Sequence, residues 1–486
     1  MQPKIELLSK ELIERVLEEA FILLMKPGIK VQLPEARELL ASAGAKVEEE
    51  TQVVYIPEVV ARQALKTVPN EFFLYNFKNE PVIRYGGDAV HFDPGSSGVH
   101  VLDPETLEHK SSFTQDLVRV IKITESLSQY DAQSTALVCN EVPKEIGDLY
   151  RLYLVLLYSD KPIVTGAFTS HTAKIMFDML AIFSGSSKAL AAKPTAVFDV
   201  CPTPPLIWSS FGAHNLIDLA HARVPAQLIS MPLAGVGAPV TLLGSIVQHA
   251  AETISGITIH QLTQPGSPIV WGGAPAIFDM RQGTTPMGAI ETAMIDAGYA
   301  QVGKYLGIPT HAYLGASDAK IVDAQAGLES GVTAMIGALA GINMISGAGM
   351  LDFLACVSPE KLVVDAEAIG MTKQLLRGIQ HQTETLATAM FEGINFKADF
   401  LKQKITRQLF LKEQYMPSEV IDRGSIRTWQ QNGSPDTFQR ARTRVKEILI
   451  KYQRPIKPPE QEHDLHELVD ELARTAGMDK LPELEL

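Results

Sequence analysis

The sequence predicts an α/β fold in which a (β/α)8 barrel is extended by helices at both ends. From about residue 130 onwards, apolar runs rich in β-forming residues alternate with segments of helical length. Eight such alternations within roughly 250 residues are the number that a (β/α)8 barrel needs. The runs are nearly continuously apolar, which is typical of parallel strands covered by helices. An open doubly wound sheet is the structural alternative, but it rarely uses eight units.

An N-terminal region, helical and then irregular, is predicted over residues 1–110 and is expected to pack on the barrel. Apolar residues at three-to-four spacing predict a helix over 4–25, which the Lys-Pro-Gly sequence at 26–28 ends. The other elements expected here are a helix over 33–47, a strand over 52–57, a helix over 57–69 and strand-like segments over 72–110.

The barrel itself is predicted over residues 111–385, and a C-terminal helical extension over 386–486. After residue 385 the chain becomes charged and helical, and a proline-rich linker occupies 453–464. The eight barrel strands are expected at 131–140, 161–168, 194–203, 225–235, 267–274, 308–317, 341–349 and 361–368.

Composition limits the classes of function. The chain has 486 residues, 46% of them hydrophobic, and a formal net charge of −13. The negative charge argues against a nucleic-acid-binding protein, which would show a basic stripe. The first residues lack the uninterrupted apolar core of a signal peptide, and no apolar stretch is long enough to span a membrane. The three cysteines form no Cys-x-x-Cys pair, so we expect a cytoplasmic protein without structural disulfides.

Charged residues follow the sixth predicted strand, in the segment GASDAKIVDAQAGLESG at 315–331. In (β/α)8 barrels, functional side chains gather at the carboxyl ends of the strands. Asp318 and Lys320 are therefore candidates for positioning a substrate or contacting a partner, whereas Asp323 suits the first turn of the next helix. The alternative is an internal ion pair that only holds this loop in shape.

Aromatic residues also stand at or near predicted strand ends. Trp271, Phe168 and Tyr313 could together enclose a quaternary ammonium through cation–π contacts. Ordinary packing of the barrel is the alternative for each ring. His100, in the segment FDPGSSGVHVLD, and His311, in the sixth strand, are further candidates for contact with the substrate.

Common catalytic motifs are missing from the sequence. It contains no His-Glu-x-x-His, no Gly-x-Ser-x-Gly and no Walker loop. The glycines of ISGAGMLD at 345–352, Gly347 among them, could present N–H groups to an anion at a helix start, or could simply form a tight turn. Cys139 and Cys201 could bind zinc together with His311, but two structural thiols are the simpler interpretation.

Three segments of the sequence resemble the trimethylamine methyltransferase family, whose members are corrinoid-dependent (β/α)8-barrel enzymes. They are GASDAKIVDAQAGLESG, FDPGSSGVHVLDPET at 92–106 and GINMISGAGMLDF at 341–353, and the run SDAKIVDAQAG is the most specific of them. The resemblance extends over nearly the whole chain. The archaeal trimethylamine enzyme of this family carries pyrrolysine, whereas this chain has only the twenty standard residues. It is therefore similar to the non-pyrrolysine branch, which includes enzymes for glycine betaine and related quaternary amines.

The resemblance implies that a methyl group passes from nitrogen to the Co(I) corrinoid of a separate partner protein. The corrinoid then supplies the nucleophile, and this chain needs no tightly bound cofactor or metal of its own. A quaternary ammonium departs as a neutral amine, so the protein has mainly to position the methyl group. A homo-oligomer is expected, with neither nucleic acid nor membrane as a partner.

Two other classes of function stay open on the sequence alone. The first is a barrel enzyme with its own metal or phosphate-bearing cofactor, either a zinc-thiolate methyltransferase or a lyase. The second is a protein that binds quaternary amines without catalysis. Methyl transfer to added Co(I) cobalamin would distinguish these possibilities.

Overall fold

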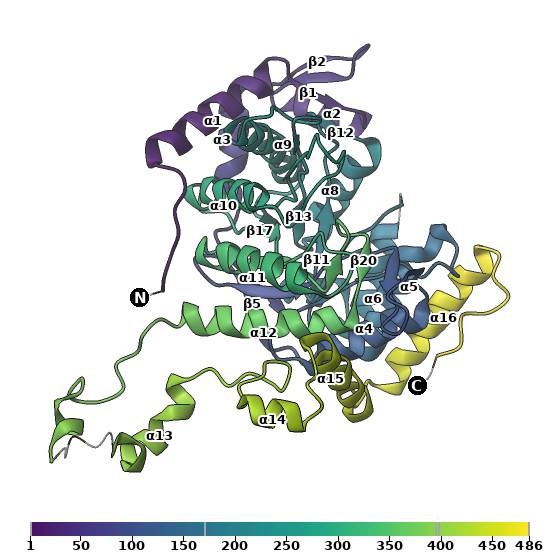
Figure 1. Cartoon of the computed structure of the whole chain (residues 1–486). Coiled ribbons are helices and arrows are strands. Elements are labelled where there is room, and N and C mark those ends of the chain that lie inside the picture. Colours follow the sequence, from purple (N-terminus) through teal and green to yellow (C-terminus); the bar gives the residue numbers. More distant parts are fainter. Residues whose placement is uncertain (1, 170–171, 394–395, 397–398, 485–486) are drawn as a thin grey trace.

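Eight short parallel strands lie at the centre of the computed structural model, which describes residues 2–169, 172–393, 396 and 399–484 (Figure 1). One sheet has five strands in the order β15-β13-β11-β10-β9, and a second has three in the order β17-β18-β6. The strands are β6 (His91–Pro94), β9 (Gln133–Ser134), β10 (Ile163–Thr165), β11 (Ala196–Val200), β13 (Ala226–Leu228), β15 (Ile269–Val270), β17 (His311–Tyr313) and β18 (Met344–Ala348).

Backbone hydrogen bonds connect the two sheets at both of their edges. Beside β15, the N–H of Trp271 donates to the carbonyl of Pro309 at 2.8 Å, and the N–H of His311 donates to the carbonyl of Trp271 at 3.2 Å. At the other edge, the N–H of Asp131 donates to the carbonyl of Phe92 at 2.8 Å. These two junctions are the connections that an eight-stranded parallel barrel requires.

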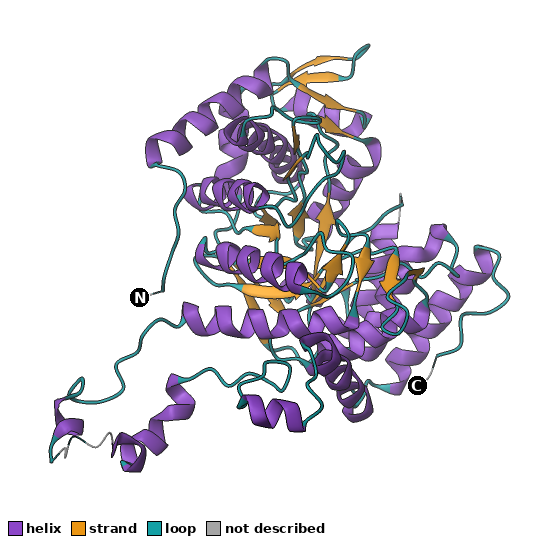
Figure 2. Ribbon diagram, viewed as in Figure 1, coloured by secondary structure: helices purple, strands orange, loops and turns teal. Residues whose placement is uncertain are grey.

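A helix follows each of the eight strands, and the helices surround the strands in Figure 2. This arrangement covers the outer face of the strands, which fits the apolar residues that most of the strands carry. The helices are α4 (Thr114–Ser126), α5 (Gly147–Tyr158), α6 (Thr172–Ser184), α8 (Ser210–Ala222), α9 (Leu242–Thr263), α10 (Ile290–Tyr305), α11 (Ala324–Leu339) and α12 (Pro359–Leu376).

One of the eight predicted strands is wrong. Residues 361–368 belong to α12, whose first turn is capped by the Ser358 hydroxyl and begins with Pro359. A short apolar run does not distinguish a strand from a buried helical segment, and here the cap favours the helix. The missing strand is β6, which lies within the region 1–110 and pairs with β18. That region therefore contributes a strand to the parallel sheets.

The rest of the N-terminal region has the three predicted helices, but the helix expected over 33–47 ends at Ser42 and strand β2 follows it. Strand β1 was not predicted, and the sheet of this region is completed by β12 from residues 207–208. Helices α1 and α3 pack on α9, and the small sheet has the strand order β12-β1-β3-β2. The elements are α1 (Lys10–Met25), α2 (Pro34–Ser42), α3 (Glu58–Thr67), β1 (Ile29–Val31), β2 (Lys46–Glu48), β3 (Val53–Tyr55) and β12 (Ile207–Trp208).

A hairpin of β4 (Phe72–Tyr75) and β5 (Pro81–Tyr85) packs at the amino end of the parallel strands. Its buried side chains form one cluster with apolar residues from the amino halves of those strands. The hairpin therefore fills this end of the strand assembly. The cluster comprises Leu74, Ile83 and Tyr85 from the hairpin and Ala132, Val164, Val197, Val270 and Met344 from the strands or the residues beside them.

Two small sheets extend from the opposite, carboxyl ends of the strands. One has the order β19-β20-β7-β8 and continues from β6 and β18, and the other pairs β14 with β16 after β13 and β15. Their strands are β7 (His100–Leu102), β8 (His109–Ser111), β14 (Leu233–Ala234), β16 (Ala276–Ile277), β19 (Met350–Leu351) and β20 (Cys356–Val357).

The C-terminal extension is helical, as predicted from its charged sequence. Helix α15 packs on α12 and α4, and α16 packs on α5 and α6, whereas α13 lies away from the body of the molecule (Figure 1). None of the helices in the described parts of the chain is long and apolar enough to cross a membrane. The remaining helices are α7 (Ser187–Ala192), α13 (Lys404–Glu413), α14 (Ile426–Gln431), α15 (Thr437–Lys451), α16 (Pro459–Thr475) and the short 3-10 turns Lys144–Ile146, Thr388–Phe391 and Asp399–Lys402.

Candidate functional site

Asp199 is the centre of a polar network inside the strand assembly. It lies two residues beyond Val197 on β11, so alternation places both side chains on the same, inner face. Gln227 of β13 donates its amide N–H to Asp199 Oδ1 at 2.7 Å, and the Tyr313 hydroxyl donates to Asp199 Oδ2 at 3.1 Å. The Tyr85 hydroxyl reaches from the hairpin and donates to Gln227 Oε1 at 3.0 Å. The network therefore connects β11, β13 and β17 just above the apolar cluster.

A second group of inward-facing polar side chains is formed by β6, β17 and β18. The Ser346 hydroxyl donates to Asp93 Oδ1 at 2.5 Å and lies 3.0 Å from Nε2 of His311. The His311 ring contacts the Tyr313 ring edge-on, with their centroids 5.1 Å apart. Asp93 is fully buried, and its Oδ2 has no hydrogen-bond partner. Two carboxyl groups thus face the same interior.

Burial controls the charge of these groups. It raises the pKa of Asp199 to about 7, against the opposing effect of the hydrogen bonds from Gln227 and Tyr313. Burial also raises the pKa of Asp93 well above its ordinary value, and the charge of Asp199 adds to this effect. The same cause lowers the pKa of His311 to about 3, so its imidazole is neutral at physiological pH. A cation placed among these groups would favour ionisation of the two carboxyls.

The cysteines are thiols rather than thiolates. Cys201 follows β11 and keeps contact with solvent, yet the surrounding protein raises the pKa of its thiol to about 12. Cys139 is buried, and burial raises the pKa of its thiol to about 12 as well. Within the described residues, no group of three or more His, Cys, Asp or Glu side chains is arranged to hold a metal ion.

Asp318 lies at the end of the sixth predicted strand and is nearly buried. Its Oδ1 accepts from the N–H of Met287 at 2.8 Å and its Oδ2 from the N–H of Gly288 at 3.0 Å. Burial raises the pKa of this carboxyl to about 6, although the two backbone bonds oppose the shift. Asp318 therefore ties its own loop to the segment that precedes α10.

The other two charged residues of this loop have different partners. Lys320 forms an ion pair with Asp352 at 3.0 Å and stands 3.9 Å above the Phe353 ring. From Asp318 the ammonium bonds the backbone carbonyl, donating to it at 2.6 Å, and Lys320 pairs with Asp352 rather than with the side chain of Asp318. Asp323 caps α11 by accepting from the N–H of Ala326 at 3.1 Å, which confirms its predicted place at the helix start.

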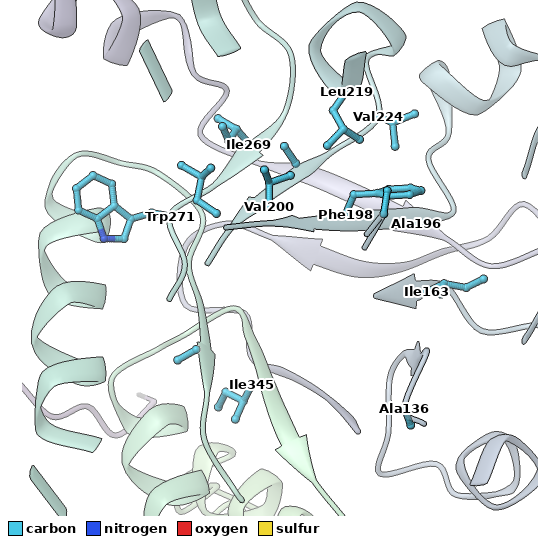
Figure 3. Close-up of a cluster of buried hydrophobic side chains, with 14 of the residues drawn as sticks. Ala136, Ile163, Ala196, Phe198, Val200, Leu219, Val224, Ile269, Trp271 and Ile345 are labelled. Atoms are coloured by element: carbon cyan, nitrogen blue, oxygen red, sulfur yellow. The ribbon is translucent and has the colours of Figure 1, made fainter. Parts of the chain in front are cut away.

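The three predicted aromatic residues lie in different environments. Trp271 has no exposed surface, and its ring packs beside α10, where a Cβ on Gly303 would lie 2.7 Å from it (Figure 3). The structure thus places Trp271 in the packing layer between strands and helices. Tyr313 faces the interior, whereas Phe168 is 54% exposed beyond β10. A cation-binding role for Phe168 and Tyr313 stays a prediction.

Gly347 and His100 lie on strands at the edge of this region. Gly347 is required by close packing within β18, because a Cβ there would lie 2.6 Å from the carbonyl oxygen of Leu314. Of the two alternatives for ISGAGMLD, the turn agrees with the structure: no helix starts here, β18 leads into β19, and the N–H of Gly349 donates to Asp365. His100 is half-buried on β7.

Comparison with known proteins gives a consistent result along the whole chain. The family model for trimethylamine methyltransferase (MTTB) matches residues 1–478. The trimethylamine methyltransferase MttB of Methanosarcina thermophila is 32% identical over 461 residues, which cover 94% of each chain. The glycine betaine methyltransferase of Desulfitobacterium hafniense strain Y51 is 28% identical over 477 residues, 98% of each chain.

Among solved structures, the monomethylamine methyltransferase MtmB of Methanosarcina barkeri has a similar fold. The TM-score is 0.52 at 12% sequence identity, and the match covers 92% of this chain and 89% of that one. At this identity the likeness concerns the fold alone.

Proposed function

Because this chain belongs to the trimethylamine methyltransferase family, we propose that it transfers a methyl group from a quaternary amine to the Co(I) corrinoid of a partner corrinoid protein. Its membership makes the chain a methyltransferase. We propose glycine betaine or a related betaine as the methyl donor, on the basis of the likeness to the glycine betaine enzyme over 98% of both chains. We further propose that the eight strands close as a (β/α)8 barrel, which the hydrogen bonds at both sheet junctions support.

The half-buried carboxyl of Asp199, held by Gln227 and Tyr313, is the observation that best supports a cationic substrate. It lies on the interior face of β11, where a bound ammonium would favour its ionised form. Asp93 adds a second carboxyl to the same interior. The thiol of Cys201, with its pKa of about 12, is a poor nucleophile at neutral pH. A site with two carboxyls and no strong nucleophile is in keeping with a methyl acceptor that a partner protein supplies.

In the proposed reaction the protein itself forms no covalent bond to the methyl group. The Co(I) corrinoid supplies the electron pair that forms the new bond to the methyl carbon. The carbon–nitrogen bond breaks, and its electron pair remains on nitrogen as a neutral tertiary amine. The side chains around Asp199 would hold the cation so that one methyl group points toward the acceptor, which is a positioning contribution to the rate.

A substrate screen tests this function directly. Purified protein is mixed with Co(I) cobalamin and, separately, with trimethylamine, glycine betaine, proline betaine, carnitine or γ-butyrobetaine, and the absorbance of methyl-Co(III) is followed. We expect transfer from at least one betaine and none from trimethylamine, because the chain contains no pyrrolysine. Rapid turnover of trimethylamine, or binding of betaines without transfer, would contradict the proposal.

We also propose that the protein acts as a cytoplasmic homo-oligomer. All three cysteines are free, which is in keeping with a reducing compartment. Helix α13 lies away from the body and exposes Phe410 and Leu411, side chains that a second copy could cover. Light scattering after gel filtration would give the mass of the particle, and a monomer would contradict the oligomer.

A further inference from the structure

Arg151 is a buried arginine at the carboxyl ends of the parallel strands. It lies in the first turns of α5, the helix that follows β9, and only 4% of its surface is exposed. Its Nη1 donates to the carbonyl oxygen of Thr135 at 3.1 Å and to the hydroxyl of Ser97 at 3.0 Å. The guanidinium carbon stands 5.0 Å from the centre of the Phe168 ring. These neighbours follow β6, β9 and β10, so the guanidinium lies where those three strands end.

Asp148 stabilises this charge electrostatically but forms no ion pair with it. In the described parts of the chain, no carboxylate oxygen lies within 4.0 Å of a guanidinium nitrogen of Arg151. Asp148, one turn earlier on α5, accepts from the N–H of Phe168 at 2.7 Å and from the hydroxyl of Thr172 at 2.8 Å. Its carboxylate is therefore occupied by the loop after β10.

An unpaired buried charge is costly, and two other buried cations of this protein each have a carboxylate partner. Arg37, which is also buried, pairs with Glu49 at 2.9 Å, and the buried Lys361 pairs with Asp365 at 2.6 Å. A guanidinium stays charged in proteins even where burial disfavours the charge. Arg151 thus keeps a positive charge, its Nη1 donates to two neutral oxygens, and the Asp148 carboxylate acts on it only from beyond ion-pair distance.

The strand ends consequently have opposite polarity on their two sides. Arg151 is positive beside β6, β9 and β10, whereas Asp199 lies on β11 and is bonded to Tyr313 of β17. Arg151 lies close enough to Tyr313 for a charge on the Tyr313 oxygen to act on the guanidinium, although the charge of Asp148 has the larger effect. A ligand that carries both a carboxylate and an ammonium would match this polarity, whereas a simple amine would match one side only.

We propose that Arg151 binds the carboxylate of a betaine substrate and thereby selects betaines over amines that lack a carboxylate. This assignment rests on the proposed function, in which Asp199 faces the quaternary ammonium. The guanidinium has several N–H donors in a planar fork, and a carboxylate accepts two of them in parallel. The residue would act in binding and orientation, because the bonds that form and break lie at the opposite end of the ligand.

The test compares glycine betaine with ethyltrimethylammonium, which has the same cationic group but a methyl group in place of the carboxylate. Binding of each ligand to the full-length protein is measured by isothermal titration calorimetry. We expect Arg151→Met to weaken betaine binding by about 10- to 100-fold and to change ethyltrimethylammonium binding less than about twofold. Arg151→Lys should recover part of the betaine affinity, since a lysine keeps the charge but not the fork.

Arg37→Met provides the matched control, because Arg37 is another buried arginine but belongs to the N-terminal region. Its betaine affinity should equal that of the wild type. Circular dichroism melts of all variants identify any that fail to fold, and the Lys variant then replaces the Met variant in the comparison. Unchanged betaine affinity in a folded Arg151 variant, or equal loss for both ligands, would overturn the assignment.

Failure of the proposed function would look different. A wild-type protein that demethylates glycine betaine while Arg151→Met has an unchanged KM contradicts only the role of Arg151. A wild-type protein that transfers no methyl group from any quaternary amine contradicts the proposed function itself.

Discussion

The Tyr313 hydroxyl donates a hydrogen bond to Asp199 Oδ2 at 3.1 Å, although their strands are not neighbours. β11 and β17 belong to different sheets, and β13 and β15 lie between them in the strand order. The bond therefore crosses the interior of the strand assembly. It fixes one oxygen of Asp199 while Gln227 fixes the other. The orientation of this carboxyl is thus determined by two strands besides its own.

The pKa of Asp199 predicts a pH-dependent affinity for cationic substrates. Burial raises that pKa to about 7, so the carboxyl becomes ionised only as the pH rises through this value. A bound ammonium interacts favourably with the ionised form alone. We expect KM for glycine betaine to rise as the pH falls below about 7, by up to about tenfold per pH unit. Steady-state kinetics between about pH 5.5 and 8.5 would show this.

The variant Asp199→Asn shows whether the pH dependence of KM comes from Asp199. It should raise KM at pH 8 and make KM nearly independent of pH over the same range. In the folded wild type the raised pKa means that unfolding becomes easier as the pH rises from about 4 to about 7, and the Asn variant should lack this loss of stability. A wild-type KM that does not change with pH would show that Asp199 does not face the substrate's charge.

Asp318 is expected to stabilise the protein through its two backbone bonds. Asp318→Asn keeps one acceptor oxygen. Its new NH2 group cannot accept a hydrogen bond, so the N–H of either Met287 or Gly288 loses its partner. The loss should lower the free energy of unfolding by about 1–3 kcal/mol. Urea unfolding measures this change, and methyl transfer is assayed on the same sample. Unchanged stability with transfer reduced at least tenfold would instead show that Asp318 positions the substrate.

Trp271 is expected to matter for stability rather than for substrate binding. Its ring is fully buried and packs near Gly303 and the His249 ring. Trp271→Ala should reduce the free energy of unfolding by about 3–5 kcal/mol. Trp271→Phe retains much of the packed volume and should bind glycine betaine like the wild type. Weaker substrate binding by a folded Trp271→Phe variant would instead support a role for Trp271 in cation binding.

Cys201 is predicted to be dispensable for the reaction. Because burial raises the pKa of its thiol to about 12, almost no thiolate is present at neutral pH. Cys201→Ser should therefore retain methyl transfer within about threefold of the wild type, and iodoacetamide should alkylate the wild-type thiol slowly. Loss of transfer by more than about tenfold in a folded Ser variant would implicate the sulfur in the chemistry.

The alternation of strands and helices was visible in the sequence because most of the strands carry apolar residues. β6 was predicted as strand-like but not as one of the parallel central strands, since its four residues HFDP are partly polar and precede a glycine. In contrast, the run KLVVDAEA resembles a strand although the cap at Ser358 makes it a helix. Local composition cannot decide such cases, because the outcome depends on the neighbouring strand.

The residues of the candidate site were harder to predict than the fold. Asp318 and Asp323 were found because charged residues after a strand are easily seen. Asp199 was missed, although one acidic residue within the apolar run PTAVFDVCPT was a usable signal. The direction of Trp271 required the register of β15, in which Val270 faces the interior cluster and the next residue points outward. Arg151 gave no signal, because its partners come from three separate segments.

The hairpin formed by β4 and β5 limits the routes by which reactants reach the interior of the strand assembly. Its side chains Leu74, Ile83 and Tyr85 occupy the amino end, so we expect reactants to enter and leave at the carboxyl end. If a bulky methyl acceptor docks at that same end, it covers whatever small molecule is already bound. The kinetic mechanism is then compulsory-ordered, with the amine binding first and its demethylated product trapped until the acceptor dissociates.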